Sequence, residues 1–350
     1  MIILGIETSC DETSVGVVDG DGFALANVVA TQVDVHARYG GIVPEVASRQ
    51  HVLDIRPVCE QAILESGVDW SDIDAVGVTH GPGLAGSLIT GLNFSKALSS
   101  ALGVPLVGVN HLEGHVYGAW IRTQENDLQP FQEYVGEKLI MCLIVSGGHT
   151  ELVLLEDHGK FKLLGETRDD AAGEAFDKAA RVMGLRYPGG PEIQRVARDA
   201  PTIEPLPRAW MKGTDDFSFS GLKTATLNRA RSLGIYPPDN SDKEVDHTII
   251  AGLAKAFQDS AVDVLVSKTV EAALREDCAG IVLVGGVAAN KALRETLVKK
   301  SPLPVGIPPF EFCTDNGAMI AMAGLINYRF GRRDDWYLDV TPNLRIGNVV

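Results

Sequence analysis

The chain begins with the stretch IILGIETSCDETSVGVV, residues 2–18, which predicts two apolar strands joined by a small, polar and acidic turn. The strands are residues 2–6 and 15–18, and the turn between them is residues 7–14. Such a turn can present backbone N–H groups and hydroxyls to a phosphate. A plain hairpin loop explains this stretch alone equally well.

The same pattern recurs in LIMCLIVSGGHTELVLL, residues 139–155. A second unit, made of a buried strand, a glycine-rich loop and a helix, occupies residues 73–98 and recurs at residues 281–297. Two copies of both units predict an α/β chain with two similar lobes. We expect a ligand in the cleft between the lobes, with each lobe contributing a polar turn.

In three other segments the order of apolar, aromatic and charged residues also predicts local structure or function. Residues 46–64 have helical spacing of apolar residues and predict a core-facing helix that starts near Pro44, with a partner surface as a further possibility. Residues 216–224 alternate aromatic residues with serines, which predicts a strand. The helix expected at residues 318–330 ends in the densest basic cluster of the chain, RFGRR at 329–333. This cluster is either a solvated helix end or a nucleic-acid contact.

Composition limits the class of protein. The 350 residues carry 46 acidic and 31 basic side chains, a net charge of −15, which argues against strong nonspecific binding of nucleic acid by the bare chain. The sequence has no apolar run long enough for a transmembrane helix. The N-terminus has no basic region of a signal peptide, and the five cysteines are dispersed. We therefore expect a protein of the reducing cytoplasm that does not bind membranes.

Two histidines form the strongest candidate site. His111 and His115 are four residues apart, so they lie on one face of a helix, directly after a strand-like run at residues 104–109. This spacing is a common half-site for a transition metal, although one histidine that packs and one that faces water is the plainer explanation. Asp315 in the string CTDNG, residues 313–317, is a possible third ligand.

The position of Glu113 argues against a metalloprotease. In the protease patterns H-E-x-x-H and H-x-x-E-H the glutamate is adjacent to one histidine, whereas Glu113 is two residues from each. At about 100° per residue, Glu113 lies near the opposite side of the helix from both histidines. It cannot easily reach a metal-bound water as a general base.

Nine strings, spread in order over nearly the whole chain, together resemble the bacterial TsaD family. They are GIETSCDET (5–13), GPGL (81–84), HLEGH (111–115), VSGGHT (145–150), AGEAFDK (172–178), YPGG (187–190), FSFSGLKT (217–224), GGVAAN (285–290) and CTDNG (313–317). The resemblance implies the two-lobed architecture of actin, sugar kinases and heat-shock ATPases. It divides the chain into a first lobe of residues 1–110 plus 325–350, and a second lobe of residues 111–324 that binds adenylate and metal.

The resemblance also implies an activity. Members of this family transfer a threonylcarbamoyl group from threonylcarbamoyl-AMP to N6 of the adenosine 3′ of the anticodon, in tRNAs that read codons beginning with A. They bind one divalent metal per subunit, iron or zinc, which here would be held by His111, His115 and Asp315. The expected adenylate contacts are Ile144, Val145, Ser146, Gly147, Gly148, Asp177, Gly190 and Asn290.

For the transfer step we expect a carboxylate that removes a proton from the weakly nucleophilic N6 amine. Asp11 and Glu12 in the first turn are the candidates, with Asp11 preferred. The resemblance implies two helper proteins, TsaB in a heterodimer and the ATPase TsaE, and we expect the helix at residues 46–64 to contact TsaB. The alternatives are an actin-like ATPase or small-molecule kinase, which needs no histidine pair, and a noncatalytic partner such as TsaB.

Overall fold

The computed structural model describes residues 1–124, 127–201, 203–236 and 247–347, and the chain divides into two compact units by its internal contacts. Unit 1 consists of Met1–Gly136, Glu156–Lys162 and Pro308–Val350, and unit 2 of Glu137–Leu155 and Leu163–Ile307. These units assign residues 111–136, 156–162 and 308–324 to unit 1, whereas the division expected from the sequence placed them in the second lobe. The last three residues of the expected first lobe, 348–350, lie outside the described residues.

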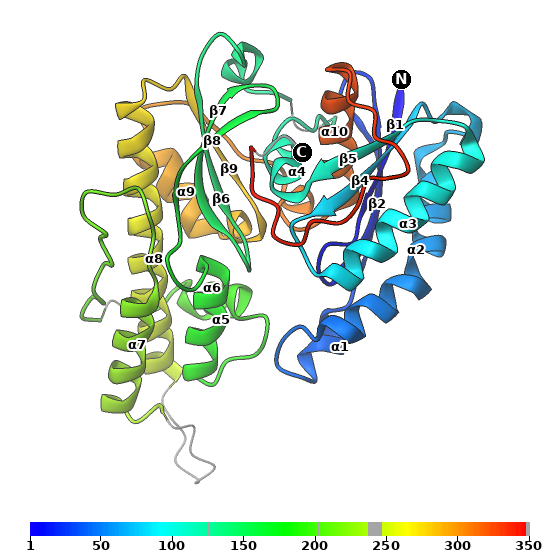
Figure 1. Cartoon of the computed structure of the whole chain (residues 1–350). Helices are drawn as coiled ribbons and strands as arrows, with labels where there is room; N and C mark the ends of the chain where they lie inside the picture. Colours follow the sequence, from blue (N-terminus) through cyan, green and yellow to red (C-terminus); the bar gives the residue numbers. More distant parts are fainter. Residues whose placement is uncertain (125–126, 202, 237–246, 348–350) are drawn as a thin grey trace. The chain divides into compact units, whose positions relative to one another are not determined.

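Each of the two sheets has five strands with the same connectivity (Figure 1). The first has the order β3-β2-β1-β4-β5, and the second the order β10-β9-β6-β7-β8. In both, an antiparallel hairpin comes first, and a later strand then pairs in parallel with the first strand of that hairpin. The duplication predicted from the hairpin and strand–loop–helix repeats is therefore confirmed.

The strands and helices of the described residues have the following bounds. The strands are β1 Ile2–Glu7, β2 Glu12–Asp19, β3 Ala24–Thr31, β4 Ala75–Gly81, β5 Leu106–Asn110, β6 Ile140–Val145, β7 Thr150–Asp157, β8 Lys160–Glu166, β9 Gly280–Val284 and β10 Val305–Gly306. The helices are α1 Val33–Ala37, α2 Pro44–Ser66, α3 Ala85–Leu102, α4 His111–Gly118, α5 Ala172–Val182, α6 Gly189–Ala197, α7 Ser220–Ser232, α8 His247–Arg275, α9 Lys291–Lys300 and α10 Gly317–Arg329. Short 3-10 helices are η1 Trp70–Asp72, η2 Pro130–Tyr134, η3 Gly286–Ala289 and η4 Phe310–Phe312.

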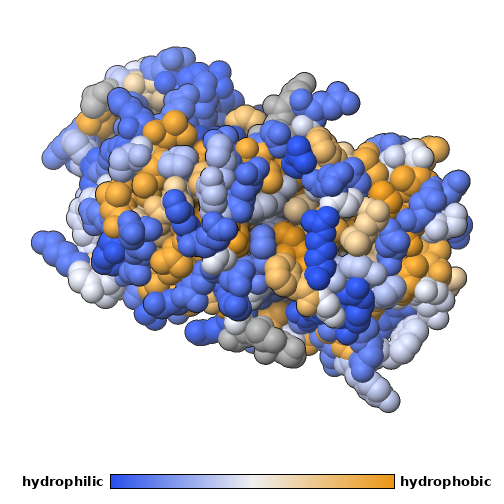
Figure 2. Space-filling model, turned by 90° about the horizontal axis from the view of Figure 1, so that it is seen from above, coloured by the Kyte–Doolittle hydropathy of each residue, from blue (hydrophilic) through white to orange (hydrophobic). Residues whose placement is uncertain are grey.

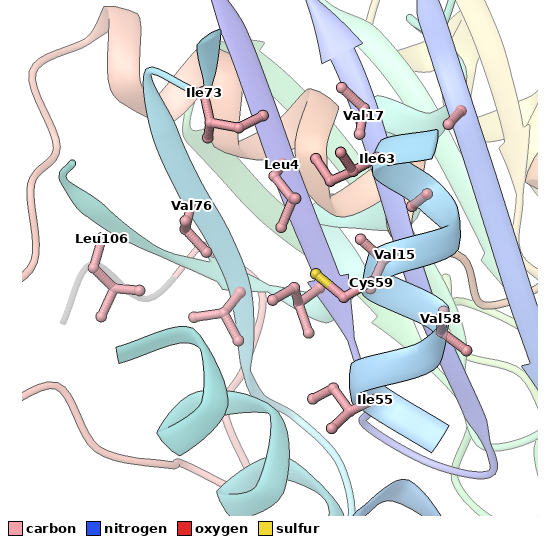
Figure 3. Close-up of a cluster of buried hydrophobic side chains, with 14 of the residues drawn as sticks. Leu4, Val15, Val17, Ile55, Val58, Cys59, Ile63, Ile73, Val76 and Leu106 are labelled. Carbon is pink, nitrogen blue, oxygen red and sulfur yellow. The ribbon is translucent and has the colours of Figure 1, made fainter. Parts of the chain in front are cut away.

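A core between α2 and the first sheet holds unit 1 together. Branched side chains of β1, β2 and β4, among them Leu4, Val15 and Val76, face Ile55 and Cys59 of α2 (Figure 3). These side chains are almost completely buried. Burial of each stabilises the fold by about 1.5–3 kcal/mol, which explains why the helix predicted at residues 44–64 forms.

Helix α10 packs on the same sheet so closely that the contact requires glycine. A Cβ atom on Gly5 of β1 would collide with the backbone of Ala321, and one on Gly16 of β2 with that of Ala318. Helix α10 also begins next to β2, where Gly317 N donates to Ser14 Oγ at 2.7 Å. The segment that carries Asp315 is thereby held against the first sheet.

The strand predicted at residues 216–224 is wrong. Only Phe217 makes a β-bridge, with Thr167, and helix α7 begins at Ser220. The alternation is real up to Phe219, because Phe217 and Phe219 are both buried. The chain then turns into a helix because the carboxylate of Asp169 accepts the N–H groups of Phe219 and Ser220, at 2.7 and 3.2 Å.

Within the described residues, none of the helices is both long and apolar enough to cross a membrane. Hydrophilic and hydrophobic residues are interspersed on the face shown in Figure 2.

Candidate metal centre and ligand-binding turns

Helix α4 presents the histidine pair from the end of a buried strand. Strand β5 ends at Asn110 and the helix starts at His111, as the sequence predicted. The Asn110 side chain caps the helix by accepting the N–H groups of Leu112 and Glu113, and its own amide donates to Arg345 O at 3.0 Å. An N-cap of this kind stabilises a helix by about 1 kcal/mol, so the first turn that carries His111 is fixed at its base.

Asp315 joins the two histidines in unit 1. Its Oδ1 lies 3.0 Å from His115 Nε2 and 3.5 Å from His111 Nε2. One ligand atom from each of the three residues lies within 4.8 Å of the others. The His115 ring is buried, yet neither of its nitrogens makes a hydrogen bond among the described residues. A buried imidazole whose Nε2 faces a carboxylate oxygen at 3.0 Å fits a metal ligand.

Glu7 and Ser9 contact the other nitrogen of His111, and Thr79 holds Glu7 in place. Glu7 Oε2 lies 3.0 Å from His111 Nδ1 and accepts the Thr79 hydroxyl at 2.6 Å, while Oε1 accepts Ser9 N. Ser9 Oγ is 3.1 Å from the same nitrogen of His111. Burial opposes the imidazolium, but Asp315 and Glu7 raise the pKa of His111 to about 9. Burial also favours neutral Glu7, but the charge of His111 and its hydrogen bond lower the pKa of this carboxyl.

The turn that carries Asp11 and Glu12 belongs to unit 1 and is held by helix α2. His51 Nε2 lies 3.0 Å from Cys10 O, and His51 Nδ1 lies 2.7 Å from the hydroxyl of Thr13. Burial, followed by repulsion from Asp315 and Asp11, raises the pKa of Glu12 well above its usual range. The Glu12 and Asp11 carboxyl groups are also hydrogen-bonded to each other.

Glu113 points away from the histidine pair, in agreement with the helical-wheel argument. Its neighbours are the Arg332 guanidinium and the backbone of Gly347 in the C-terminal segment. Burial raises the pKa of Glu113 to about 7.

In unit 2, the turn Ser146–Gly148 follows strand β6 and meets the start of helix α5. Ser146 N donates to His149 O at 2.8 Å, His149 N donates to Ser146 Oγ at 3.1 Å, and Gly173 N donates to Ser146 O at 3.1 Å. Gly147 and Gly148 have open space where a Cβ would lie. This turn can therefore approach a phosphate closely.

Asp177 lies on α5 beside the start of α6. Its Oδ1 accepts Gly189 N at 2.7 Å, and a second backbone bond comes from Gly190. Burial is the main cause that raises the pKa of Asp177. Gly190 has open space around its missing Cβ. The structure thus brings Asp177 and Gly190 together, as two neighbouring groups on one side of α5.

The other candidate adenylate residues, Ile144, Val145 and Asn290, have buried side chains. Asn290 is buried, caps α9 through Leu293 N at 3.0 Å, and donates to Gln258 Oε1 at 2.9 Å. The side chains of Ile144 and Val145 are completely buried in the sheet. Helix η3, which precedes Asn290, packs against both β6 and α5. The backbone around Asn290 therefore lies near the Ser146–Gly148 turn, although its side chain is engaged.

Sequence analysis missed Glu7 and Ser9 as neighbours of His111, and Thr79 as the residue that donates to Glu7. Glu7 was treated only as part of a polar turn. A buried acid at the end of a first strand is the one signal in the sequence that could have indicated it, because ionised carboxylates are rarely buried without a partner.

Comparisons with known proteins agree with this geometry. The family model described as "TsaD: tRNA N6-adenosine threonylcarbamoyltransferase" matches residues 24–322. Proteins named tRNA N6-adenosine threonylcarbamoyltransferase are 49% identical in Dehalococcoides mccartyi, over 99% of both chains. In Bacillus subtilis the identity is 46%, over 99% of this chain and 96% of that protein.

Solved structures support the fold alone. Full-length HypF in its phosphate- and nucleotide-bound form has a TM-score of 0.58 at 13% identity, covering 94% of this chain and 55% of HypF. Component A of (R)-2-hydroxyglutaryl-CoA dehydratase from Acidaminococcus fermentans has a TM-score of 0.52 at 13% identity, covering 94% and 98% of the two chains. These neighbours confirm the actin-like ATPase fold expected from the duplicated sheets. From the sequence matches, the chain belongs to the TsaD family and is a transferase that forms N6-threonylcarbamoyladenosine in tRNA.

Proposed function

We propose that the donor is threonylcarbamoyl-AMP and that the acceptor is N6 of the adenosine 3′ of the anticodon, in tRNAs reading codons that begin with A. The observation that carries this proposal is the cluster of His111, His115 and Asp315, whose ligand atoms lie within 4.8 Å of one another. A transferase of this family would bind its metal through such a cluster. A kinase needs no histidine pair, because it binds its phosphates with magnesium and carboxylates. Family membership does not favour the alternative of an ATPase or small-molecule kinase.

One divalent metal per subunit, iron or zinc, is the cofactor in this proposal. His111 Nε2, His115 Nε2 and a carboxylate oxygen of Asp315 would hold it. Two imidazoles and one carboxylate suit both metals and leave coordination positions open for a substrate. When bound, the metal supplies Lewis-acid polarisation and orientation of the threonylcarbamoyl end.

Residues of unit 2 would hold the adenylate. The open Ser146–Gly148 turn suits the phosphate, Asp177 suits the ribose hydroxyls, and Gly190 suits the flat base. The remaining contacts would come from strand β6 and the segment after η3, at Ile144, Val145 and Asn290. The burial of these three side chains supports backbone contacts from the strand end in preference to side-chain contacts.

In the reaction, the N6 amine attacks the carbamoyl carbon, and the bond from that carbon to the phosphate oxygen breaks. AMP leaves with the electron pair of that bond, and the amine loses one proton. We assign the removal of this proton to Asp11, with Glu12 as the second candidate. Burial is the main cause that raises the pKa of Glu12, and a protonated Glu12 cannot accept a proton, which supports Asp11 as the preferred base.

The proposal includes two helper proteins and a cytoplasmic location. TsaB would bind helix α2, where Val52 and Leu53 are 63% and 68% exposed. Neighbouring exposed apolar residues are typical of partner surfaces. The ATPase TsaE would join this complex.

The test is a reconstituted transfer reaction. The purified, metal-loaded chain, with and without TsaB and TsaE, is incubated with threonylcarbamoyl-AMP and an unmodified tRNA that reads a codon beginning with A. Nucleoside mass spectrometry then measures N6-threonylcarbamoyladenosine, and a tRNA reading other codons is the control. A chain that forms no product under any of these conditions refutes the proposal.

A further inference from the structure

Among the described acids of unit 1, Glu7 is the most completely buried, and it contacts no proposed substrate. Its side chain is fully buried at the end of strand β1. A buried carboxylate is very unfavourable unless its oxygens are paired. Here Oε2 accepts from both His111 and Thr79, and Oε1 accepts Ser9 N.

These contacts fix the carboxylate rigidly. Thr79 lies on β4, which pairs in parallel with β1, so the donor and acceptor sit on neighbouring strands of one sheet. The 2.6 Å bond from the Thr79 hydroxyl holds the same oxygen that faces His111. The carboxylate therefore cannot rotate away from the imidazole without losing a second hydrogen bond.

The direction of this contact determines which nitrogen of His111 is free. A carboxylate can only accept, so Nδ1 must carry the proton that it shares with Glu7. Nε2 then keeps its lone pair when His111 is neutral, and Nε2 is the nitrogen 3.5 Å from Asp315 Oδ1. Carboxylates that orient a histidine in this way raise its basicity as a metal ligand.

We propose that Glu7 is a positioning residue that fixes the tautomer and orientation of His111, so that Nε2 binds the metal. This inference rests on the proposed metal centre of His111, His115 and Asp315. It assigns to Glu7 a role that depends on His111 and on no contact with substrate.

The test is metal binding by the full-length apoprotein, measured without tRNA or donor. Co²⁺ is titrated and followed by its visible absorption, and Zn²⁺ is measured by competition with Co²⁺. Glu7→Gln should weaken Co²⁺ binding by about 10- to 100-fold and change the absorption spectrum. The matched control is Glu113→Gln, which alters a buried glutamate between the two histidines whose carboxylate faces Arg332 instead, and it should bind Co²⁺ as the wild type does.

A double-mutant cycle separates positioning from a general charge effect. In a His111→Ala background, Glu7→Gln should cause no further loss of Co²⁺ affinity, because the residue through which it acts is gone. Wild-type affinity in Glu7→Gln, or an equal loss in both backgrounds, overturns the inference. If circular dichroism shows that Glu7→Gln does not fold, Thr79→Val carries the test. This variant keeps the Glu7 carboxylate but removes the hydrogen bond from Thr79 to Oε2. We therefore expect the Thr79→Val protein to bind Co²⁺ several-fold more weakly, and unchanged binding overturns the inference.

The same titrations give a different result if the proposed metal centre itself is wrong. A wild-type chain that binds neither Co²⁺ nor Zn²⁺ refutes the proposed metal centre and the role of Glu7 with it. Wild-type binding together with unaltered binding by Glu7→Gln refutes only the role of Glu7.

Discussion

Replacing Gly173 by alanine tests the proposed phosphate turn without touching a residue of that turn. Gly173 lies in the first turn of α5, and a Cβ there would lie 2.6 Å from Ser146 O and 2.7 Å from Gly147 Cα. Both atoms belong to the backbone, so no side-chain rotation relieves the clash. The Ser146–Gly148 turn must move away from the helix.

The size of the effect follows from these distances. The contact is about 0.8 Å shorter than the 3.4 Å at which ordinary van der Waals contact begins. Overpacking of this kind costs about 1–3 kcal/mol, and alanine offsets about 0.5–1 kcal/mol of this by favouring the helix. The turn can retreat into the open space beside Gly147 and Gly148, so we expect unfolding to become easier by only about 0–2 kcal/mol.

We expect Gly173→Ala to reduce kcat/KM for transfer more strongly than it reduces the stability of the fold. A displacement near 1 Å can reduce the rate of a positioned reaction by about 100-fold, so we expect kcat/KM to fall by about 10- to 100-fold, mainly through KM for threonylcarbamoyl-AMP. Steady-state transfer assays measure this, and urea unfolding measures stability. Gly221→Ala is the control, because Gly221 is an exposed position of helix α7 where a Cβ would meet nothing within 4 Å, and this variant should leave transfer unchanged. A folded Gly173→Ala enzyme with the wild-type KM for the donor would refute the assignment of this turn.

Four further outcomes are expected. Asp11→Ala should still bind the adenylate but transfer at least about 100-fold more slowly in single-turnover assays, and full activity would exclude its role as the base. Leu53→Asp should prevent formation of the TsaB heterodimer in gel filtration without unfolding α2, because Leu53 is exposed, and an intact heterodimer would exclude this interface. Asp169→Ala should destabilise the protein by about 1–2 kcal/mol in urea unfolding because α7 loses its N-terminal acceptor, whereas Asp169→Asn should retain most of the stability. Arg329→Ala with Arg333→Ala should weaken tRNA binding and reduce its salt dependence by about one unit of slope per lost phosphate contact. Both arginines are exposed, and the same segment exposes Phe330, Trp336 and Tyr337 to 66%, 61% and 91%, which could stack on bases. Arg49→Ala with Arg56→Ala, which removes arginines paired with Glu45 and Glu60 on α2, is the control for that pair, and equal effects of the two double variants would argue against a specific RNA contact.

Local patterns in the sequence were sufficient to predict most of the secondary structure. The hairpin of β1 and β2 follows from alternating apolar runs around a polar turn, and the repetition of that pattern at residues 139–155 predicted the second sheet. The pairing of His111 with His115 follows from helical geometry alone, since four residues bring two side chains onto one face. Asp315 was a possible third ligand from its own string, and the resemblance then assigned it to the same metal as the two histidines, about two hundred positions earlier.

Other features depend on contacts between segments that are distant in the sequence. The helix at Ser220 begins where Asp169 accepts two backbone N–H groups, and no periodicity within residues 216–224 could reveal that acceptor. The side chain of Asn290 is engaged by Gln258 of α8, which a motif string cannot show.

The sequence by itself therefore determined the duplicated α/β fold, the family and the identity of the candidate metal ligands, because these depend on local periodicity and on ordered strings. Only the tertiary structure decided how the site is held. Glu7 lies next to His111 because β1 pairs with β4, and β5 directs α4 back over the end of that sheet. A hydrogen bond across strands has no pattern along the chain, so the tautomer of His111 could be inferred only after the chain was folded.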